Sequence, residues 1–214
     1  MKRRELIKSL GAFGALASLP VYSLFRNMQN DQLHFIGLGS GGTNVAWRIR
    51  QKGVTAGYSC FNWFPTFVEP YKGFHHIDYE YPREFRQCNE LGRKRIPLTN
   101  EMKSSLSKEG YYVVLVGLGA YTGTSLISEV IEFLEARKAN YLAICSLPFF
   151  NEGRTRNEYA RAKMKELEKY ARVKFFDNEE ILKRFGVMKI SKSFEKADEE
   201  IYCIFQREFQ NFKS

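Results

Sequence analysis

From Gln32 onward, short apolar runs alternate along the chain with segments of helical spacing. The apolar runs are rich in Val, Ile, Leu, Phe and Tyr without strict alternation, a pattern typical of strands covered on both faces. The last helical segment carries one apolar stripe through Phe194, Ala197, Ile201, Phe205, Phe209 and Phe212. The predicted strands are residues 33–38, 56–61, 111–118, 141–147 and 173–176, and the predicted helices are residues 44–51, 100–108, 124–137, 155–171 and 194–212. This order predicts an α/β fold: a Rossmann-like, three-layer parallel sheet with helices on both faces.

The 214 residues suffice for one such domain, which we assign to residues 31–214, with residues 1–30 as a separate leader. The net charge of +9 comes from 33 basic against 24 acidic residues. In the leader, Lys2, Arg3, Arg4, Lys8 and Arg26 stand against Glu5 alone. Because so much of the excess lies there, nucleic acid is not the expected partner.

The leader begins with Lys2-Arg3-Arg4 and continues with an apolar stretch over residues 10–25. This resembles a twin-arginine export signal, a bacterial feature, and residues 15–17 form an A-x-A-like cleavage site. The stretch is short for a transmembrane helix, which needs about 20 residues. Three interpretations stay open: export, an uncleaved anchor at the membrane surface, or a chance match in a cytoplasmic protein.

The four cysteines are far apart and form no C-x-x-C pair. Cys60 and Cys145 lie in apolar runs, which predicts buried free thiols and indicates a reducing compartment. His75 and His76 are adjacent, so on a strand they would point to opposite faces. We therefore predict no metal site built from protein side chains.

Two glycine-rich loops each follow a predicted strand and lead into a helix: residues 37–44 and residues 117–125. Such loops allow close backbone approach, and the amides of a helix N-terminus favour a phosphate. The first loop satisfies G-x-G-x-x-G, but residues 61–63, where a dinucleotide site would carry an acidic residue, are Phe-Asn-Trp. Neither loop contains the lysine of a Walker A motif. Two such loops favour a nucleoside triphosphate over a dinucleotide.

The second loop resembles the FtsZ/tubulin signature G-G-G-T-G-[ST]-G. Thr122, Gly123 and Thr124 match it, whereas Ala120 and Tyr121 replace glycines, as Ser125 does. The first loop resembles the other glycine loop of that family, including its closing Asn44. The similarity runs in order through about residues 33–210, so the resemblance implies an FtsZ/tubulin-like GTP-binding domain over residues 31–214.

The resemblance also implies a base pocket. Residues 147–156 are similar to the family's K-P-F-x-F-E-G-x-x-R segment, which puts Glu152 at the ribose and Arg156 at the sugar and phosphate side. Asn178 would read the guanine edge, Phe194 would stack on the base, and Asp198 would accept from its ring nitrogen and amino group. Taken singly, these three residues are more often a helix cap, a core residue and a solvated charge. The full predicted set is Gly39, Ser40, Gly41, Gly42, Asn44, Gly119, Ala120, Tyr121, Thr122, Gly123, Thr124, Glu152, Arg156, Asn178, Phe194 and Asp198.

The sequence departs from the family in two phosphate segments and at its end. Residues 90–97 are basic where the family has a glycine-rich loop, so either cationic side chains meet the γ-phosphate or the loop is a solvated turn. Tyr121 would narrow the phosphate cradle. The sequence stops near the end of the predicted helix 194–212, before the loop that in the family activates water on a neighbour's nucleotide. We expect no catalytic residues, slow or absent hydrolysis and no ordinary filament.

The leading hypothesis is therefore a protein that binds GTP or GDP with Mg²⁺ and acts as a membrane-associated or cytoskeletal accessory. Its expected partners are a protein at the exposed end of the last helix and a membrane at the leader. The alternative is an exported structural or interaction module that has lost nucleotide chemistry, because an exported protein would not meet GTP. An NAD-linked oxidoreductase ranks third, and nucleic-acid binding ranks fourth.

Overall fold

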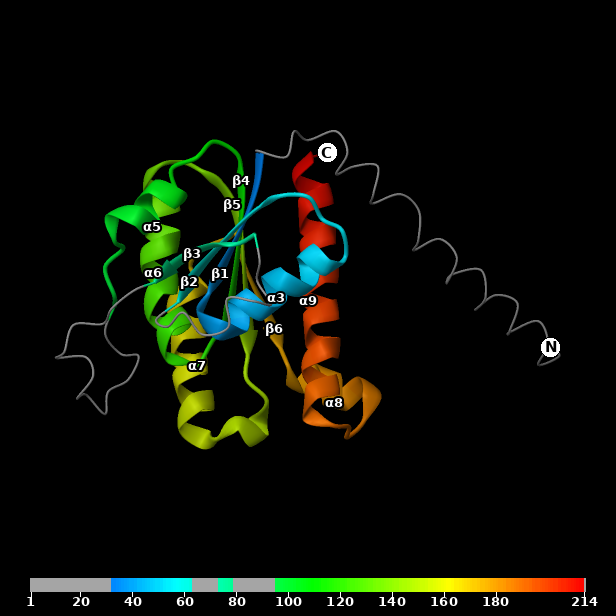
Figure 1. Ribbon diagram of the computed structural model, residues 1–214. Helices are drawn as coiled ribbons and strands as arrows, with labels where there is room; N and C mark the ends of the chain where they lie inside the picture. The colour runs from blue at the N-terminus through cyan, green and yellow to red at the C-terminus, as the bar shows by residue number, and fades with distance from the viewer. Residues whose placement is uncertain (1–31, 63–72, 79–94, 214) are drawn as a thin grey trace.

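Two layers of helices enclose a parallel sheet in the computed structural model, which describes residues 32–62, 73–78 and 95–213 (Figure 1). The strands are β1 (Leu33–Leu38), β2 (Gly57–Asn62), β3 (His75–Asp78), β4 (Tyr111–Gly117), β5 (Asn140–Leu147) and β6 (Val173–Asp177). The helices are α3 (Gly39–Gln51), α5 (Asn100–Ser105), α6 (Tyr121–Ala136), the 3-10 turn η3 (Phe150–Glu152), α7 (Arg154–Leu167), α8 (Glu179–Phe185) and α9 (Ile190–Lys213).

The strands lie in the order β3-β2-β1-β4-β5-β6, and all neighbouring strands are parallel. From β1 the chain adds strands toward one edge of the sheet, and from β4 it adds them toward the other, so the order of strand addition reverses between β1 and β4. Those two central strands run in register, with Leu38 opposite Val116. Each is followed by one of the two glycine-rich segments. In open α/β sheets, ligands bind outside the carboxyl ends of the strands at this reversal. The predicted fold class is confirmed, and its topology directs attention to the edge where β1 and β4 end.

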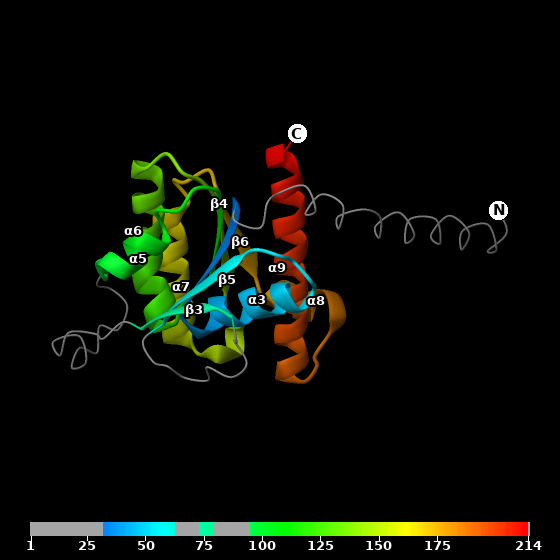
Figure 2. The same ribbon diagram turned by 45° about the horizontal axis from the view of Figure 1, so that its top comes forward.

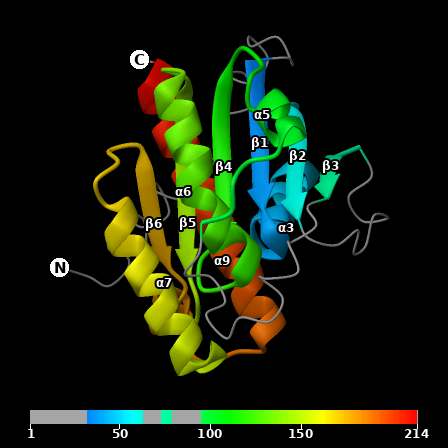
Figure 3. The same ribbon diagram turned by 90° about the vertical axis from the view of Figure 1, so that its left-hand side faces the viewer.

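The helices divide between the two faces of the sheet. The helices α5, α6 and α7 cover one face, and α3, α8 and α9 cover the other (Figures 1 and 2). Figure 3 shows α6 and α7 side by side in front of the sheet. Along β1, Ile36 packs with the first layer, whereas Phe35 contacts Phe205 of α9 with ring centroids 5.0 Å apart. Burial on both faces, worth about 1.5–3 kcal/mol per large apolar side chain, explains the uninterrupted apolar runs.

The five predicted strands agree with the structure to within one residue at each end. The first helix was predicted too short: α3 begins at Gly39, so the first glycine loop is its opening turn. The helices α5 and α7 end earlier than predicted, at Ser105 and Leu167. Three elements were not predicted. β3 has four residues and pairs with β2 alone among the described strands. α8 has seven residues, too few to show a period, and η3 is a single turn of three residues.

The apolar stripe of the last helix is core rather than a partner surface. Ala197, Ile201, Phe205 and Phe209 are each at most 3% exposed, against the sheet. Phe212 is 49% exposed, with its ring 4.5 Å from that of Tyr111. The surface that the sequence offered to a protein partner is thus limited to the last turns of α9.

Two of the cysteine predictions are confirmed: Cys60 and Cys145 are buried free thiols, and burial raises the pKa of Cys60 to about 12. Cys203, on α9, is exposed and free. The leader, Cys88 and residues 90–94, the first part of the basic segment 90–97, lie outside the described residues. Within the described part of the chain, no helix combines the length and apolar character that crossing a membrane requires.

Candidate functional site

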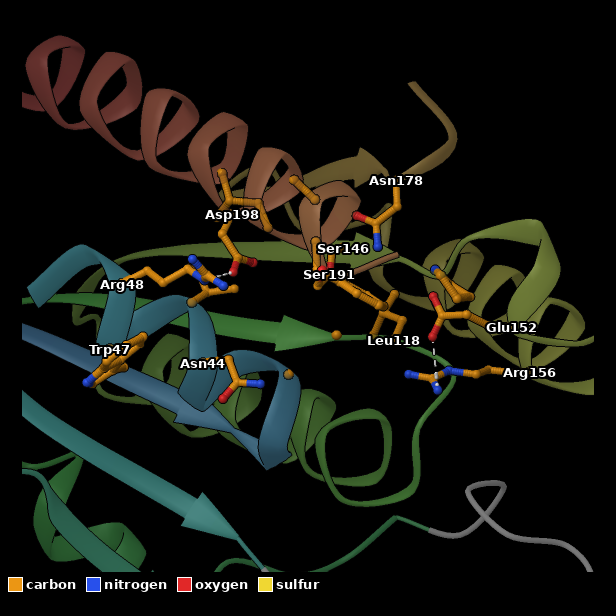
Figure 4. Close-up of a pocket in the computed structure, with 17 residues that line it drawn as sticks. Asn44, Trp47, Arg48, Leu118, Ser146, Glu152, Arg156, Asn178, Ser191 and Asp198 are labelled. Carbon is orange, nitrogen blue, oxygen red and sulfur yellow. Dashed lines mark ion pairs between the residues drawn. The ribbon is translucent and has the colours of Figure 1, made fainter. Parts of the chain in front are cut away.

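A cavity of about 620 Å³ opens at the carboxyl edge of the sheet, between α3, α9 and the ends of β4 and β5 (Figure 4). This volume lies within the range of about 300–1,000 Å³ that small-molecule sites occupy. Seven of the residues predicted from the sequence line this cavity: Gly41, Asn44, Glu152, Arg156, Asn178, Phe194 and Asp198. These residues come from positions as far apart as 41 and 198, so the fold gathers them at the reversal point.

The first glycine segment combines packing with access to the cavity. A Cβ on Gly42 would lie 2.0 Å from the carbonyl oxygen of Leu115, so this glycine lets α3 sit directly on β4. Gly39 has a φ of +65°, and a Cβ there would come 3.1 Å from the backbone nitrogen of Gly123. Gly41 differs from both, because it is exposed, lines the cavity and has room for a Cβ. Ser40 beside it is also exposed.

The second glycine segment packs against its neighbours in the same way. Gly119 has a φ of +85°, and a Cβ there would meet the carbonyl of Arg156 at 2.5 Å. Its N–H donates to the Thr124 hydroxyl at 2.9 Å, which fixes the turn before α6. A Cβ on Gly123 would lie 2.6 Å from a Val116 methyl. Gly117 and Leu118 of this segment line the cavity.

The other residues predicted in the second loop lie around the start of α6. Thr122 is buried, as are Gly123 and Thr124, and Ala120 is exposed. Tyr121 is half-buried and packs against the core cluster on the α5, α6 and α7 side of the sheet. Tyr121 is not among the residues that line the cavity.

On the right-hand wall of Figure 4, Glu152 and Arg156 form an ion pair. An Arg156 Nη1 lies 3.0 Å from Glu152 Oε2, while Oε1 of Glu152 accepts from the Phe149 N–H at 2.7 Å. The Nε of Arg156 is buried, and no described residue accepts a hydrogen bond from it. The Glu152 carboxylate therefore stabilises its own loop through the Phe149 N–H and also positions Arg156 at the cavity wall.

Asn157 stabilises this loop, and it was not among the site residues predicted from the sequence. Its side chain is buried, and Nδ2 donates to the carbonyls of Phe149 and Gly153, each at 3.0 Å. The signal was present in the sequence: Asn157 stands three residues before Ala160 on the apolar stripe of α7. A polar residue on a buried stripe usually has a specific hydrogen-bonding partner.

Asn178 occupies the N-cap position of α8, but its side chain makes no capping hydrogen bond. The cap is Asp177, whose Oδ1 accepts from the N–H of Glu179 at 3.1 Å. The Asn178 side chain is 5% exposed and points into the cavity, and its Oδ1 has no hydrogen-bond partner among the described residues (Figure 4). A buried, unpaired acceptor is costly, by about 1–3 kcal/mol, so this geometry favours a ligand with a donor at that place.

Phe194 forms the aromatic part of the wall. It is 37% exposed, and its ring stands edge-on to that of the buried Phe149, with centroids 5.1 Å apart and an interplanar angle of 85°. The contact with the buried Phe149 ring thus fixes the position of the Phe194 ring. An exposed aromatic ring beside polar groups is suited to stacking on a planar ligand.

Asp198 follows Phe194 by one turn of α9 and pairs with Arg48 of α3. The Arg48 Nε lies 2.6 Å from Asp198 Oδ2, and the side chain of Asp198 is 11% exposed. Burial raises the pKa of Asp198 from 3.8 to about 7, and the charge and hydrogen bond of Arg48 oppose that rise. The sequence predictions missed Arg48, although it stands four residues after Asn44 and so shares its helix face.

The basic segment 90–97 is described only from Arg95 onward. Arg95 donates to Glu132 through Nη2, and its Nε lies 3.2 Å from Glu129. The hydrogen bond to Glu132 raises the pKa of Arg95. Arg95 therefore makes a structural contact with α6, whereas residues 90–94, which include Arg93 and Lys94, lie outside the described residues.

No protein-family model matches the sequence, and comparison with curated proteins gives no match. Solved structures do match the fold. An empty FtsZ dimer from M. jannaschii aligns with a TM-score of 0.65 at 20% identity, covering 86% of this chain and 56% of the FtsZ chain. CetZ2 from Haloferax volcanii, in a GTPγS-bound protofilament, aligns at 0.60 and 17% identity, covering 82% of this chain and 57% of CetZ2. The GDP-bound phage tubulin PhuZ aligns at 0.56 and 19% identity, covering 84% and 57%.

These matches show that the chain has the fold of the FtsZ/tubulin nucleotide-binding domain, as the motifs predicted. The aligned part is a little over half the length of each matched protein.

Proposed function

We propose that this protein binds guanine nucleotides in the 620 Å³ cavity at the carboxyl edge of its sheet. The observation that carries the proposal is the convergence of Asn178, Phe194 and Asp198 on this single cavity. Each of the three has an ordinary structural explanation when taken alone. An unpaired amide oxygen, an exposed ring and a buried carboxylate together form a site for a planar, donor-rich base.

The chemistry of the base edge supports guanine. Guanine presents a ring N1–H and an exocyclic amino group, both donors, next to the O6 acceptor. The Asp198 carboxylate only accepts, and Asn178 both accepts and donates. Adenine would place a bare ring nitrogen where the carboxylate needs a donor. A polar group left unpaired in this way costs about 1–3 kcal/mol, which corresponds to roughly tenfold or more in affinity.

The ribose and phosphates would extend from the base toward Glu152, Arg156 and Gly41. Glu152 is a hydroxyl acceptor and Arg156 a phosphate donor, and Gly41 belongs to the first turn of α3. A helix N-terminus favours anionic groups through its backbone N–H groups and its dipole. Among the described residues, no three His, Cys, Asp or Glu side chains cluster as a metal site. Mg²⁺ would therefore be held mainly by phosphate oxygens and water.

The structural matches support the same ligand class, since CetZ2 was solved with GTPγS and PhuZ with GDP. For hydrolysis we propose a slow rate or none, because the two carboxylates among the described residues that line the cavity are engaged. Glu152 holds Arg156 and the Phe149 amide, and Asp198 holds Arg48. The wider proposal is an accessory role at a membrane or beside a filament. It rests on the leader, and on protofilament and filament structures among the matches.

Calorimetric titration of the full chain with GTP, GDP, ATP and NAD, each with Mg²⁺, tests the proposal. We expect GTP and GDP to bind at least about tenfold more tightly than ATP, and NAD to bind more weakly still. Asp198→Ala should reduce the preference for guanine, whereas a change of the exposed Lys183 to Ala on α8 should not. Absence of binding to all four nucleotides would contradict the proposal. It would favour the exported module that has lost nucleotide chemistry, for which the leader is the supporting feature.

A further inference from the structure

We infer that Arg48 is a positioning residue that sets base selectivity by holding Asp198 in its ionised form. The inference rests on the proposed function and deepens it, because it concerns how the same cavity distinguishes guanine from adenine. It starts from the contact between Arg48 and Asp198, which joins two helices that belong to distant parts of the sequence.

The pair forms a wall of the cavity. Arg48 reaches across from α3, its Nε 2.6 Å from Asp198 Oδ2, and both side chains line the nucleotide cavity (Figure 4). A second cavity of about 240 Å³ is lined by the same two residues, and by Lys52. The ion pair therefore belongs to the walls of both cavities. The guanidinium fixes one carboxylate oxygen of Asp198 and leaves the other oriented for a ligand.

The charges around Asp198 oppose one another. Its own helix contributes Glu195 and Glu199, which disfavour a further negative charge. Positive charge comes from Arg48 of α3 and from Lys52, the residue that follows α3. Across the cavity stand Glu152 and Arg156, which neutralise each other. Burial raises the pKa of Asp198 to about 7 even with Arg48 in contact. Arg48 is the group in direct contact that favours the carboxylate, so its removal should leave Asp198 protonated at neutral pH.

The two protonation states of Asp198 recognise different bases. A carboxylate only accepts, which matches the N1–H and amino group of guanine. A neutral carboxylic acid carries one O–H donor beside one acceptor oxygen. That pair matches adenine, whose N1 accepts and whose amino group donates. Ionisation of this one side chain therefore changes the base preference without any change in shape.

The experiment measures the affinity of the full chain for GDP and for ADP between about pH 5.5 and about pH 8.5. The ratio of the two affinities is used because changes in diphosphate ionisation cancel. In the unaltered protein the preference for GDP should fall by up to about tenfold per pH unit below about pH 7. Arg48→Met should move this decline to higher pH by about one unit or more. Arg48→Lys, which keeps the charge, should restore most of the original profile.

Two outcomes separate this inference from the proposed function. A protein that shows no preference for GDP at any pH contradicts both. A preference for GDP whose pH profile is the same in Arg48→Met as in the unaltered protein overturns the role of Arg48 alone, and leaves the guanine site standing.

A measurement without nucleotide gives the same test if Arg48→Met binds poorly or unfolds. Carbon-13 NMR of the Asp carboxyl groups, with Asp198 assigned by its loss in Asp198→Asn, reports the pKa directly. In the unaltered chain we expect titration near neutral pH, in contrast to a surface carboxylate. In Arg48→Met we expect a higher pKa still, and in Arg48→Lys a value near that of the unaltered chain. An Asp198 pKa in Arg48→Met that is no higher than that of the unaltered chain would overturn the inference.

Discussion

Asp177, not Asn178, caps helix α8: its carboxylate accepts from the N–H of Glu179 at 3.1 Å. The neighbouring amide is thereby left for another purpose, and it lies buried at the cavity with an unpaired oxygen. Adjacent residues thus divide two roles that a sequence pattern cannot separate. One stabilises a helix terminus, and the other is available to a ligand.

This division predicts opposite effects for two alanine substitutions. Asn178→Ala should weaken GDP binding by about 1–3 kcal/mol and leave the free energy of unfolding nearly unchanged, because the unligated amide oxygen has no partner to lose. Asp177→Ala should lower the free energy of unfolding by about 1 kcal/mol through loss of the cap. Calorimetric titration and urea unfolding of both variants check this. Equal losses of stability would assign Asn178 a structural role.

The glycines of α3 give a second matched pair. Gly42→Ala should destabilise the fold by several kcal/mol, since its Cβ would overlap the Leu115 carbonyl at 2.0 Å and push α3 off β4. A Cβ at Gly41, one position earlier, would lie 3.5 Å from its nearest atoms, which is an ordinary contact. Gly41→Ala should therefore unfold at a urea concentration similar to that of the unaltered chain. Because Gly41 lines the cavity, its substitution should instead weaken phosphate binding. Similar denaturation midpoints for the two variants would contradict the assignment.

Much of the fold could be predicted from the sequence because strands buried on both faces leave continuous apolar runs, as in residues 33–38 and 111–117. The strand β3 was not predicted, because four residues are too few for an apolar run to stand out in the sequence. That Phe194 and Asp198 line one cavity could be predicted from motif order and from their spacing on one helix.

Arg48 and Asn157 were not predicted, because their roles depend on tertiary contacts. Arg48 meets a residue 150 positions away, and Asn157 binds carbonyls of a loop whose shape no local pattern specifies. The packing of Tyr121 against the core cluster likewise depends on tertiary contacts that its loop sequence does not show.

Asp198 should make the stability of the unligated protein depend on pH. Its pKa rises from 3.8 to about 7 on folding, so the folded state binds the proton more tightly. The associated stability is fully present below about pH 4 and is lost as the pH rises toward about 7, by roughly 4 kcal/mol at most. Asp198→Asn carries no such proton. As the pH rises from about 4 to about 8, the free energy of unfolding of the unaltered protein should therefore fall relative to that of Asp198→Asn. Urea denaturation of both proteins at each pH measures this difference. A constant difference would show that the carboxyl group titrates alike in both states.

Asn157 links the stability of the loop over residues 149–153 to the affinity of the site. Its Nδ2 donates to the carbonyls of Phe149 and Gly153, and the same loop carries Glu152, which holds Arg156 at the cavity wall. Asn157→Ala leaves buried carbonyls without their donor, so the free energy of unfolding should fall by about 1–3 kcal/mol, and GDP affinity should fall with it. Asn151→Ala, an exposed position on the same loop, provides the control and should change neither quantity by more than about 0.5 kcal/mol. Loss of stability with unchanged GDP affinity would show that the loop does not position the ligand, and the assignment of Glu152 and Arg156 to the ribose and phosphates would then have to be abandoned.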